Sequence, residues 1–255
     1  MRKLFFLILV PLLNFGQQTF VPDDAFEQAL INFNIDPNPI LDDSVPTAII
    51  STLANLAIDN KGINDLTGIE DFIYLDYLNC EGNNLEELNL SGNSLLTFLD
   101  CSNNNLNELS LTNNALLNTL NCSNNNLNNL NISNCIELSH LQCDNNNLNE
   151  LDVSNNTELI GLTCTDNDLD CIQVWNVDFV LLNQADCSWS GQMDCFQKDE
   201  IAIWSLDCNL AANTEESLIT NPVKKSFNLL GKDTDDSYFI FEIYEDGSVK
   251  KYLKF

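Results

Sequence analysis

Positive charge is scarce in this sequence. Ten Lys and Arg face 38 Asp and Glu, which gives a formal net charge of -28 at pH 7. Such a surface repels phosphate backbones and anionic lipid headgroups. We therefore expect no binding to nucleic acid or to the surface of a membrane. The same acidity can attract calcium or basic partners, or can simply keep the chain in solution.

Signatures of catalysis are also missing. The chain has one histidine, His140, and no glycine-rich phosphate loop, zinc motif or nucleophile elbow. Ser139 is not expected to pair with His140, because adjacent residues of a strand point to opposite faces. We expect no enzymatic activity, no cofactor and no metal.

Long apolar runs are absent after the first residues, so no membrane span is expected. The start itself is typical of a signal peptide. Arg2 and Lys3 precede the apolar segment from Leu4 to Leu13, and Gly16 is a small residue suited to cleavage. Residues 1–16 are therefore predicted to be a signal peptide, and the protein is predicted to be secreted or held on the outer cell surface.

Five cysteines stand 21 residues apart: Cys80, Cys101, Cys122, Cys143 and Cys164. A leucine comes two residues before each of them, and apolar residues recur five, eight and ten residues after it. The third residue after each cysteine is asparagine: Asn83, Asn104, Asn125, Asn146 and Asn167. A fixed register of this kind is the signature of a repeat architecture.

The spacing suggests a physical arrangement. Each Leu-x-Cys forms a short strand with its apolar residues on one side, and strands of successive repeats pair in parallel at about 4.8 Å per step. One coil cannot bury its own leucines, so neighbouring coils share a core. The asparagine follows the strand where the backbone bends inward, and its amide can satisfy unpaired backbone donors and acceptors.

The sequence resembles the leucine-rich-repeat family. Its motif L-x-x-L-x-L-x-x-N-x-L is matched by Leu96, Leu99, Cys101, Asn104 and Leu106. Residues 99–106 (LDCSNNNL) and 151–159 (LDVSNNTEL) are similar to repeats of secreted Bacteroidetes proteins of this type. The resemblance implies an α/β-type repeat solenoid, a horseshoe or coil with a parallel sheet on one face.

An earlier, degenerate coil is predicted before the first cysteine, with Ile58 in the place of the cysteine. It keeps the apolar spacing at Leu56, Ile58, Ile63, Leu66, Ile69, Phe72 and Leu75, with turns at Gly62 and Gly68. Residues 20–33 look helical: Asp23 can cap the helix, and one face carries Phe26, Ala29, Leu30 and Phe33. Residues 17–50 are therefore predicted to be a helical N-terminal cap, and residues 51–177 the repeats.

The five periodic cysteines are predicted to be buried free thiols. Ligands in a row do not surround a metal ion, and parallel neighbours point the same way, which suits a disulfide poorly. Cys135 lies in a turn where other repeats have asparagine. Residues 168–177 resemble the closing segment of the Bacteroidetes proteins, which implies a disulfide between Cys171 and Cys195, or Cys187 as the alternative partner, in a C-terminal cap over residues 178–208.

Asp166, Asp168 and Asp170 alternate along the chain, as calcium ligands often do. Asn167 and Leu169 between them belong to the repeat pattern, and the glycine of a calcium loop is missing. These aspartates are therefore interpreted as the exposed partners of scaffold residues. A calcium-dependent structural or adhesion matrix protein is kept as an alternative function, and a hydrolase as another.

The strand residues that the core does not use are predicted to form a concave recognition face. Its residues are Tyr77, Asn79, Glu81, Phe98, Asp100, Ser102, Asn121, His140, Gln142 and Asp144. Solenoids bind partners through such extended faces. We therefore predict a binding module for a protein or polysaccharide partner.

The C-terminal part departs from the repeat. Residues 209–224 read as a linker, and Asp246-Gly247 between two apolar segments predicts a hairpin. Residues 225–255 resemble the C-terminal sorting signal of type IX secretion cargo, through NLLGK, IYEDGSVKKYLK and the terminal lysine Lys254. Of the YPNP-like motif that opens such signals, Thr220-Asn221-Pro222-Val223 is the counterpart here. The resemblance implies the type IX secretion machinery as a partner.

Overall fold

The structure is a computed structural model of the 255-residue chain. It describes residues 16–177, 180, 196–199, 202–208, 223–227, 240–244 and 249–252. The predicted signal peptide therefore lies outside the described residues, apart from Gly16. The chain divides into two compact units, residues 1–206 and 207–255.

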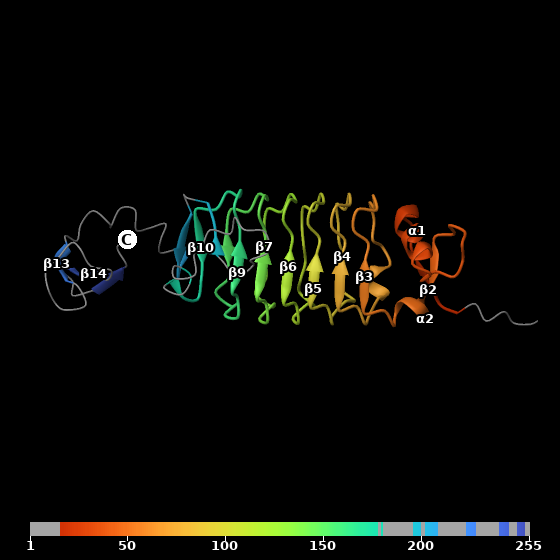
Figure 1. The fold of residues 1–255 in the computed structure, drawn as a ribbon, viewed down its shortest axis with the longest axis horizontal. Coiled ribbons are helices and arrows are strands. Elements are labelled where there is room, and N and C mark those ends of the chain that lie inside the picture. Colours follow the sequence, from red (N-terminus) through yellow and green to blue (C-terminus); the bar gives the residue numbers. More distant parts are fainter. Residues whose placement is uncertain are drawn as a thin grey trace, which may run out of the picture. The chain divides into compact units, whose positions relative to one another are not determined.

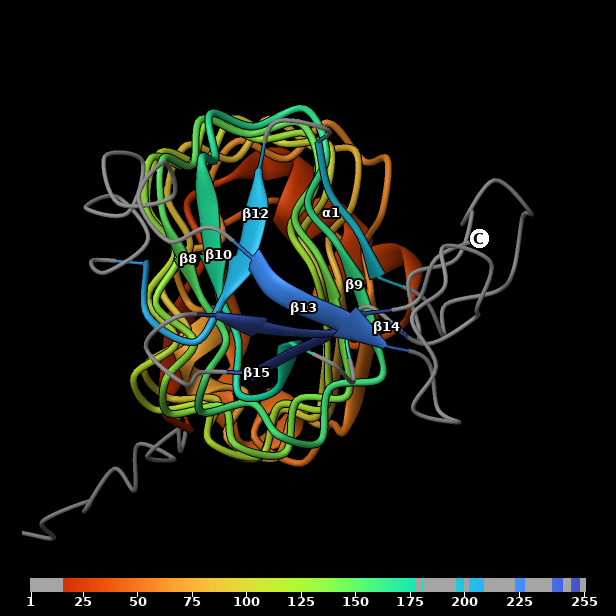
Figure 2. The same ribbon diagram turned by 90° about the vertical axis from the view of Figure 1, so that its left-hand side faces the viewer.

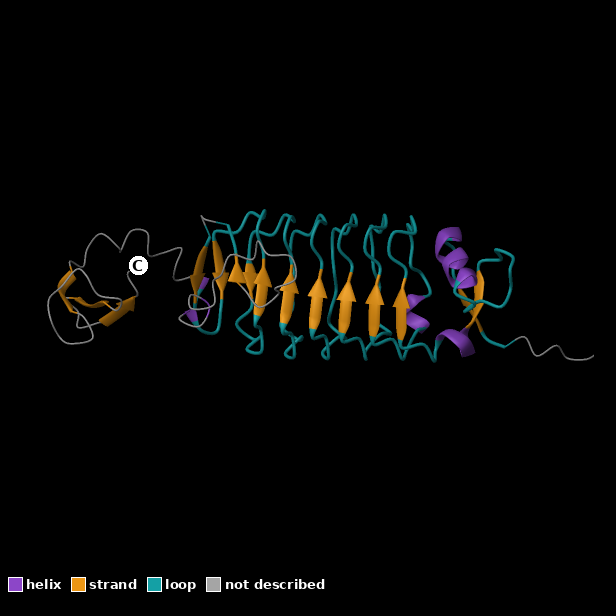
Figure 3. Ribbon diagram, viewed as in Figure 1, coloured by secondary structure: helices purple, strands orange, loops and turns teal. Residues whose placement is uncertain are grey.

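The first unit is a parallel-sheet solenoid of about six turns with few helices (Figures 1 and 3). Its main sheet has seven strands in the order β11-β9-β7-β6-β5-β4-β3. Their bounds are β3 Asn55–Ala57, β4 Tyr77–Asn79, β5 Phe98–Asp100, β6 Thr119–Asn121, β7 His140–Gln142, β9 Gly161–Thr163 and β11 Phe196–Gln197. Seen along the stack, successive coils lie one behind another (Figure 2).

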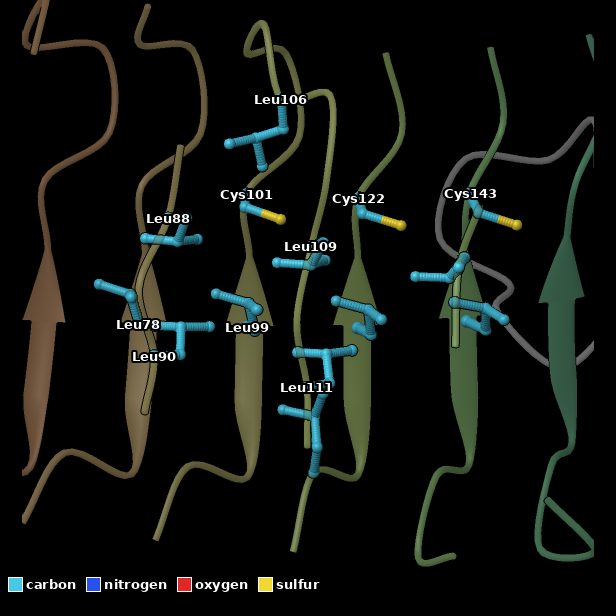
Figure 4. Close-up of a cluster of buried hydrophobic side chains, with 14 of the residues drawn as sticks. Leu78, Leu88, Leu90, Leu99, Cys101, Leu106, Leu109, Leu111, Cys122 and Cys143 are labelled. Carbon is cyan, nitrogen blue, oxygen red and sulfur yellow. The ribbon is translucent and has the colours of Figure 1, made fainter. Parts of the chain in front are cut away.

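The register of the sheet explains how the leucines form one core. Leu78 pairs with Leu99, and Leu99 with Leu120, so each central leucine of a strand lies above the next. Each of these strands ends one residue before its cysteine. The side chains of Leu99, Cys101 and Cys122 point into the interior, as Figure 4 shows, and all three are fully buried. The prediction that the periodic cysteines are buried free thiols is confirmed for all five.

A second parallel sheet, of three strands, was not predicted. It has the order β12-β10-β8, with β8 Leu151–Asp152, β10 Cys171–Gln173 and β12 Ile203–Ser205. Cys171 at the start of β10 is bonded to Cys208, so the expected disulfide with Cys195 is wrong. The pairing of β12 with β10 brings the chain that follows β12 back to Cys171. Cys195 and Cys187 lie outside the described residues.

The N-terminal cap combines a helix with a small sheet. β1 (Gln18–Phe20) pairs antiparallel with β2 (Ser44–Pro46), and α2 (Thr47–Ile50) follows. Helix α1 spans Asp24–Asn32 and buries Phe26, Ala29 and Leu30. Phe33 is 45% exposed because it comes after the last helical residue, so its expected place on the buried face is wrong.

The degenerate first coil is present. All seven of its predicted apolar residues, from Leu56 to Leu75, are buried, and η1 (Ile69–Asp71) lies between them. The carboxylate of Asp23 caps α1 through Oδ1, which accepts the N–H groups of Ala25 and Phe26, both at 2.9 Å. Its other oxygen, Oδ2, accepts the N–H of Asn64 at 2.9 Å and so ties the cap to the first coil.

The second unit contains an antiparallel sheet in the order β13-β14-β15. β13 spans Val223–Phe227, β14 spans Ile240–Tyr244 and β15 spans Val249–Tyr252. β14 pairs with β15, with Ile243 opposite Val249, which agrees with the hairpin expected around Asp246-Gly247. The turn residues themselves lie outside the described residues.

Candidate functional site

The turn after each strand fixes where the outward-facing side chains stand. The second residue after the cysteine position takes a left-handed backbone, with φ between 53° and 66° at Asn60, Gly82, Asn103, Asn124, Asn145 and Asp166. Gly, Asn and Asp tolerate this conformation best. The repeated Asn-Asn pair therefore has two tasks: the first asparagine makes the turn and the second enters the core.

The second asparagine acts as the repeat pattern predicted. The amide Nδ2 of Asn104 donates to the carbonyls of Cys80 and Cys101, both at 3.0 Å, and its Oδ1 accepts the N–H of Leu85 at 3.0 Å. Asn125 repeats this pattern one coil further on, with Leu106 as the donor. The row therefore satisfies donors and acceptors of neighbouring coils.

A second row of fully buried asparagines lies elsewhere in the coils, at Asn93, Asn114 and Asn156. Their Nδ2 atoms donate to backbone carbonyls, for example Asn93 to Ile69 at 2.9 Å, but their Oδ1 atoms have no hydrogen-bond partner. Cys135 takes the corresponding place in the remaining coil, and it is buried and free. The sequence does carry a signal for this second row, because Asn93, Asn114, Cys135 and Asn156 follow one another at the same 21-residue spacing.

The cysteine row is chemically quiet. Burial, with a smaller contribution from the negative charges of Asp144 and Asp100, raises the pKa of Cys122 to about 12. Burial likewise raises the pKa of Cys135 to about 11. A thiol must ionise to act as a nucleophile or a metal ligand, so these cysteines are packing groups at neutral pH.

The exposed side of the main sheet, here called the sheet face, carries one aromatic pair. Tyr77 on β4 and Phe98 on β5 are partners in the register, and their rings stack with centroids 4.4 Å apart and planes 9° from parallel. Each ring stands on its strand and covers one side of the other. The neighbouring strands carry smaller residues at this position, Asn55 on β3 and Thr119 on β6.

A hollow of about 380 Å³ opens beside this pair. Its lining consists of Phe33, Ile35, Asn55, Leu56, Ala57 and Tyr77. The hollow exists because β3 carries the short side chains of Asn55 and Ala57 next to the large ring of Tyr77. The chain at the end of α1 contributes Phe33, whose exposure follows from its place after the helix. This hollow was not predicted from the sequence, because Phe33 and Ile35 on its far wall come from the N-terminal cap.

Carboxylates continue the sheet face beyond the aromatic pair. Oδ1 of Asp100 accepts the N–H of Ser102 at 3.0 Å, and its Oδ2 accepts Nδ2 of Asn121 at 3.1 Å. Oδ1 of Asp144 accepts the N–H of Thr165 at 2.8 Å. Ser102 was predicted to be part of the recognition face, but it is only 2% exposed and offers no surface to a partner.

Ser139 and His140 contact each other, contrary to expectation. Ser139 Oγ lies 2.8 Å from His140 Nδ1. Strand alternation does not apply here, because β7 begins at His140 and Ser139 belongs to the preceding loop. The hydroxyl of Ser139 also contacts Oδ1 of Asn118 at 2.9 Å, which places it in a loop contact between two coils.

The three alternating aspartates stand at the end of the regular repeats. Asp166 makes the left-handed turn of its coil, with φ 55°. The backbone N–H groups of Asp166 and Asn167 donate to the two carboxylate oxygens of Asp199, at 3.0 and 3.2 Å. Within the described parts of the chain, no group of three or more His, Cys, Asp or Glu is arranged to hold a metal ion.

Stacked coils with a parallel sheet, inward leucines and an asparagine row make this fold a leucine-rich-repeat solenoid. The chain is similar to the functional domain of InlJ from Listeria monocytogenes, which includes a cysteine ladder: 31% identity, 76% of this chain and 45% of that chain, TM-score 0.55. It is also similar in fold to the internalin InlF from Listeria monocytogenes: 24% identity, 60% of this chain and 50% of that chain, TM-score 0.53.

These structural neighbours are internalins, which are leucine-rich-repeat proteins. The chain spans about half the length of the two structures, 45% and 50%. No protein-family model matches the chain, and no curated protein matches it. None of the helices in the described parts of the chain has the length and apolarity that a membrane crossing requires.

Proposed function

We propose that this chain is a protein-binding module that recognises its partner through the sheet face. The observation that carries the proposal is the stacked pair of Tyr77 and Phe98 next to the hollow. Aromatic side chains are enriched at the centres of protein interfaces. The pair stands on a sheet whose turns are held by buried asparagines, so its position is set before any partner arrives and binding orders few groups.

An array of proteins, extended peptides and glycans, incubated with residues 17–255, tests this function. The double variant Tyr77→Ala/Phe98→Ala should lose at least tenfold in affinity for any partner found. The matched control is Leu95→Ala/Leu116→Ala, which removes two exposed apolar side chains, 40% and 47% exposed, outside the sheet face. Equal losses in both variants, or unchanged binding of the aromatic variant, would show that the sheet face is not the binding surface.

We propose further that the protein acts outside the cell. Support comes from the charged and apolar start at residues 1–16 and from the disulfide between Cys171 and Cys208, since disulfides persist in oxidising compartments. The mature N-terminus of the exported protein should begin at Gln17, as mass spectrometry can establish. A protein that keeps residues 1–16 and stays in the cytoplasm would contradict the proposal.

The resemblance of residues 225–255 to a type IX sorting signal supports export across both membranes of a bacterial envelope. Deleting residues 225–255 should leave the protein in the periplasm, whereas the full chain reaches the medium or the surface. Fractionation with an antibody against the repeats measures this. Normal export of the truncated protein would refute the role of the tail without touching the proposed binding function.

A further inference from the structure

Building on the proposed function, we infer the chemistry of the partner: an extended cationic peptide segment. One large apolar side chain of this segment enters the hollow beside Tyr77. Two Lys or Arg side chains further along the segment lie over Asp100 and Asp144. The inference rests on the shape of the hollow, on the way the two carboxylates are held, and on the charge of the coils.

The hollow suits an apolar side chain. At about 380 Å³ it lies at the small end of ligand sites, which run from roughly 300 to 1,000 Å³. Its walls include Phe33, Ile35, Ala57 and the ring of Tyr77, and Asn55 supplies the one side-chain amide. A sugar ring would need several polar groups around it, whereas burial of an aromatic or branched aliphatic group against this apolar lining is favourable.

The two carboxylates are oriented by neutral groups. Asp100 is held by the Ser102 backbone, the Ser102 hydroxyl and the Asn121 amide. Asp144 is held by the backbone and hydroxyl of Thr165 and by the hydroxyl of Thr163. Neutral donors position a carboxylate but leave its charge uncompensated, so each remains an acceptor for an incoming ammonium or guanidinium group.

The charge of the whole stack favours the same partner. Lys61 is the only Lys or Arg between residues 16 and 177, whereas every coil in this range contains Asp or Glu. Such a field attracts cationic segments, speeds their association and repels anionic ones. It therefore selects against acidic peptides and charged anionic glycans.

The spacing of the two carboxylates limits the sequence of the peptide. Asp100 ends β5 and Asp144 follows β7, and one strand, β6, lies between them. At about 4.8 Å per strand this separates the two coils by about 10 Å. A peptide in the extended polyproline II conformation rises about 3.1 Å per residue and completes a turn in three residues, so side chains three positions apart point the same way at about this distance. The basic residues are therefore expected three positions apart, with the apolar residue about three positions before the first.

The direct test measures binding of a fluorescent peptide of Gly and Ser that carries Phe, Lys and Lys at three-residue intervals, in both chain directions. Matched probes replace the Phe with Ala or both Lys with Glu, and neutral oligosaccharides such as chitohexaose form a separate arm. The protein is residues 17–255 with its disulfide intact, and the readout is fluorescence anisotropy at low and high salt.

Three variants locate the binding. Ala57→Trp fills the hollow from an exposed position, and Asp100→Asn/Asp144→Asn removes the two charges while retaining the size of the side chains. Glu108→Gln/Glu150→Gln makes the same charge change on exposed residues outside the sheet face. Asn121 occupies the position of Asp100 in the next coil, and its Oδ1 accepts the N–H of Ser123 in the same way. The repeat therefore tolerates asparagine at this position, and Asp100→Asn should not disturb the fold. Circular dichroism checks folding.

We expect the Phe-Lys-Lys probe to bind, and to lose at least tenfold in affinity with the Ala57→Trp variant and with the Asp100→Asn/Asp144→Asn variant. The Glu108→Gln/Glu150→Gln control should change affinity less than twofold. The inference is overturned if the Lys-to-Glu probe binds as tightly as the Phe-Lys-Lys probe. It is also overturned if Ala57→Trp leaves the affinity unchanged, or if only the oligosaccharide binds. Absence of peptide binding, together with a protein partner that depends on Tyr77 and Phe98 in the array, overturns the inference and leaves the proposed function standing.

Discussion

The interior of the coil stack and its two ends use different side chains to accept hydrogen bonds from backbone N–H groups of the turns. Inside the stack, a turn N–H such as that of Leu106 donates to the amide oxygen of Asn125 at 3.0 Å. At the N-terminal end, the N–H of Asn64 donates to the carboxylate of Asp23 at 2.9 Å. At the far end of the regular repeats, the N–H of Asp166 donates to Asp199 at 3.0 Å.

The difference follows from which backbone hydrogen-bonding groups are left unpaired at each place. Between two coils both donors and acceptors are left over, and an amide serves both at once. The end positions leave backbone donors without a neighbouring coil, and a carboxylate, which only accepts, suits them. The interior is therefore held by groups that do not titrate, whereas the N-terminal end depends on an ionised group.

The largest expected effect is in the interior. Asn125→Ala removes three donations, to the carbonyls of Cys101, Cys122 and Ser123, and leaves the Leu106 N–H without its acceptor. Unsatisfied buried groups cost roughly 1–3 kcal/mol each, so we expect a loss of about 4 kcal/mol in the free energy of unfolding, measured in urea. Asn126→Ala, at the exposed neighbouring residue, is the control. Comparable losses in both would break the comparison.

A smaller loss is expected at the N-terminal end. Asp23→Asn converts an acceptor of the Asn64 and Asp65 N–H groups into a donor, and hydrogen bonds to charged groups contribute roughly 1.5–3 kcal/mol. We expect a loss of about 2 kcal/mol at pH 7 in the same urea experiment. Asp24→Asn, one residue further on and exposed, should cost about 0.5 kcal/mol through the helix dipole alone.

The pH dependence separates the two regions. Burial by itself would raise the pKa of Asp23, but hydrogen bonds from Asn64, Phe26 and Asp65 outweigh it and lower that pKa. Because the folded-state pKa lies below the unfolded value of about 3.9, the contribution is complete above about pH 4 and is lost as the pH falls through the folded-state pKa. The difference between wild type and Asp23→Asn should shrink below pH 4, while that for Asn125→Ala stays constant. A constant difference for both would contradict the assignment.

The second asparagine row should respond less than the first. Asn114 donates to the carbonyl of Asn93 at 2.9 Å, but its Oδ1 has no partner, so Asn114→Ala also removes a buried unsatisfied atom. We expect a loss of about 1.5 kcal/mol. Cys135→Asn adds one bonded and one unbonded polar atom and should change stability by less than about 1 kcal/mol. If Asn114→Ala cost as much as Asn125→Ala, its Oδ1 would need a partner such as a buried water.

The weakest response is expected from the thiols. Since burial raises the pKa of Cys122 to about 12, iodoacetamide at pH 8 should leave it and the other four periodic cysteines unlabelled in the folded protein. Denaturation in urea should expose all of them, as peptide mapping by mass spectrometry shows. Rapid native labelling at Cys101 or Cys122 would mean that coils open readily in the interior.

Much of the scaffold follows from one period in the sequence. The position of Leu99, the burial of Cys101 and the amide contacts of Asn104 were all predicted, since each depends only on a residue's place within its own coil. The capping role of Asp23 was predicted for the same reason, because it acts on the next turn of the chain. Its contacts with the backbone of Asn64 and Asp65 in the first coil were not predicted.

The features that were missed depend on residues far apart in the chain. The hollow needs Phe33 from the cap beside Tyr77, and the partner of Cys171 is set by the pairing of β12 with β10. The contact of Ser139 with His140 depends on the residue at which β7 begins, which a period cannot locate to within one position. Of the candidate site, Tyr77 and Phe98 were predicted as residues of the recognition face, whereas the hollow beside Tyr77 was not predicted.

The buried cysteine row also imposes a kinetic condition. A thiol that is protonated and enclosed in the finished stack is protected, but the same five thiols are accessible while the chain is unfolded. In an oxidising compartment, closure of each coil on its neighbour competes with oxidation of the thiols still exposed. Repeat proteins extend structure from coil to coil, so the time window for wrong disulfides is set by the slowest coil to join the stack.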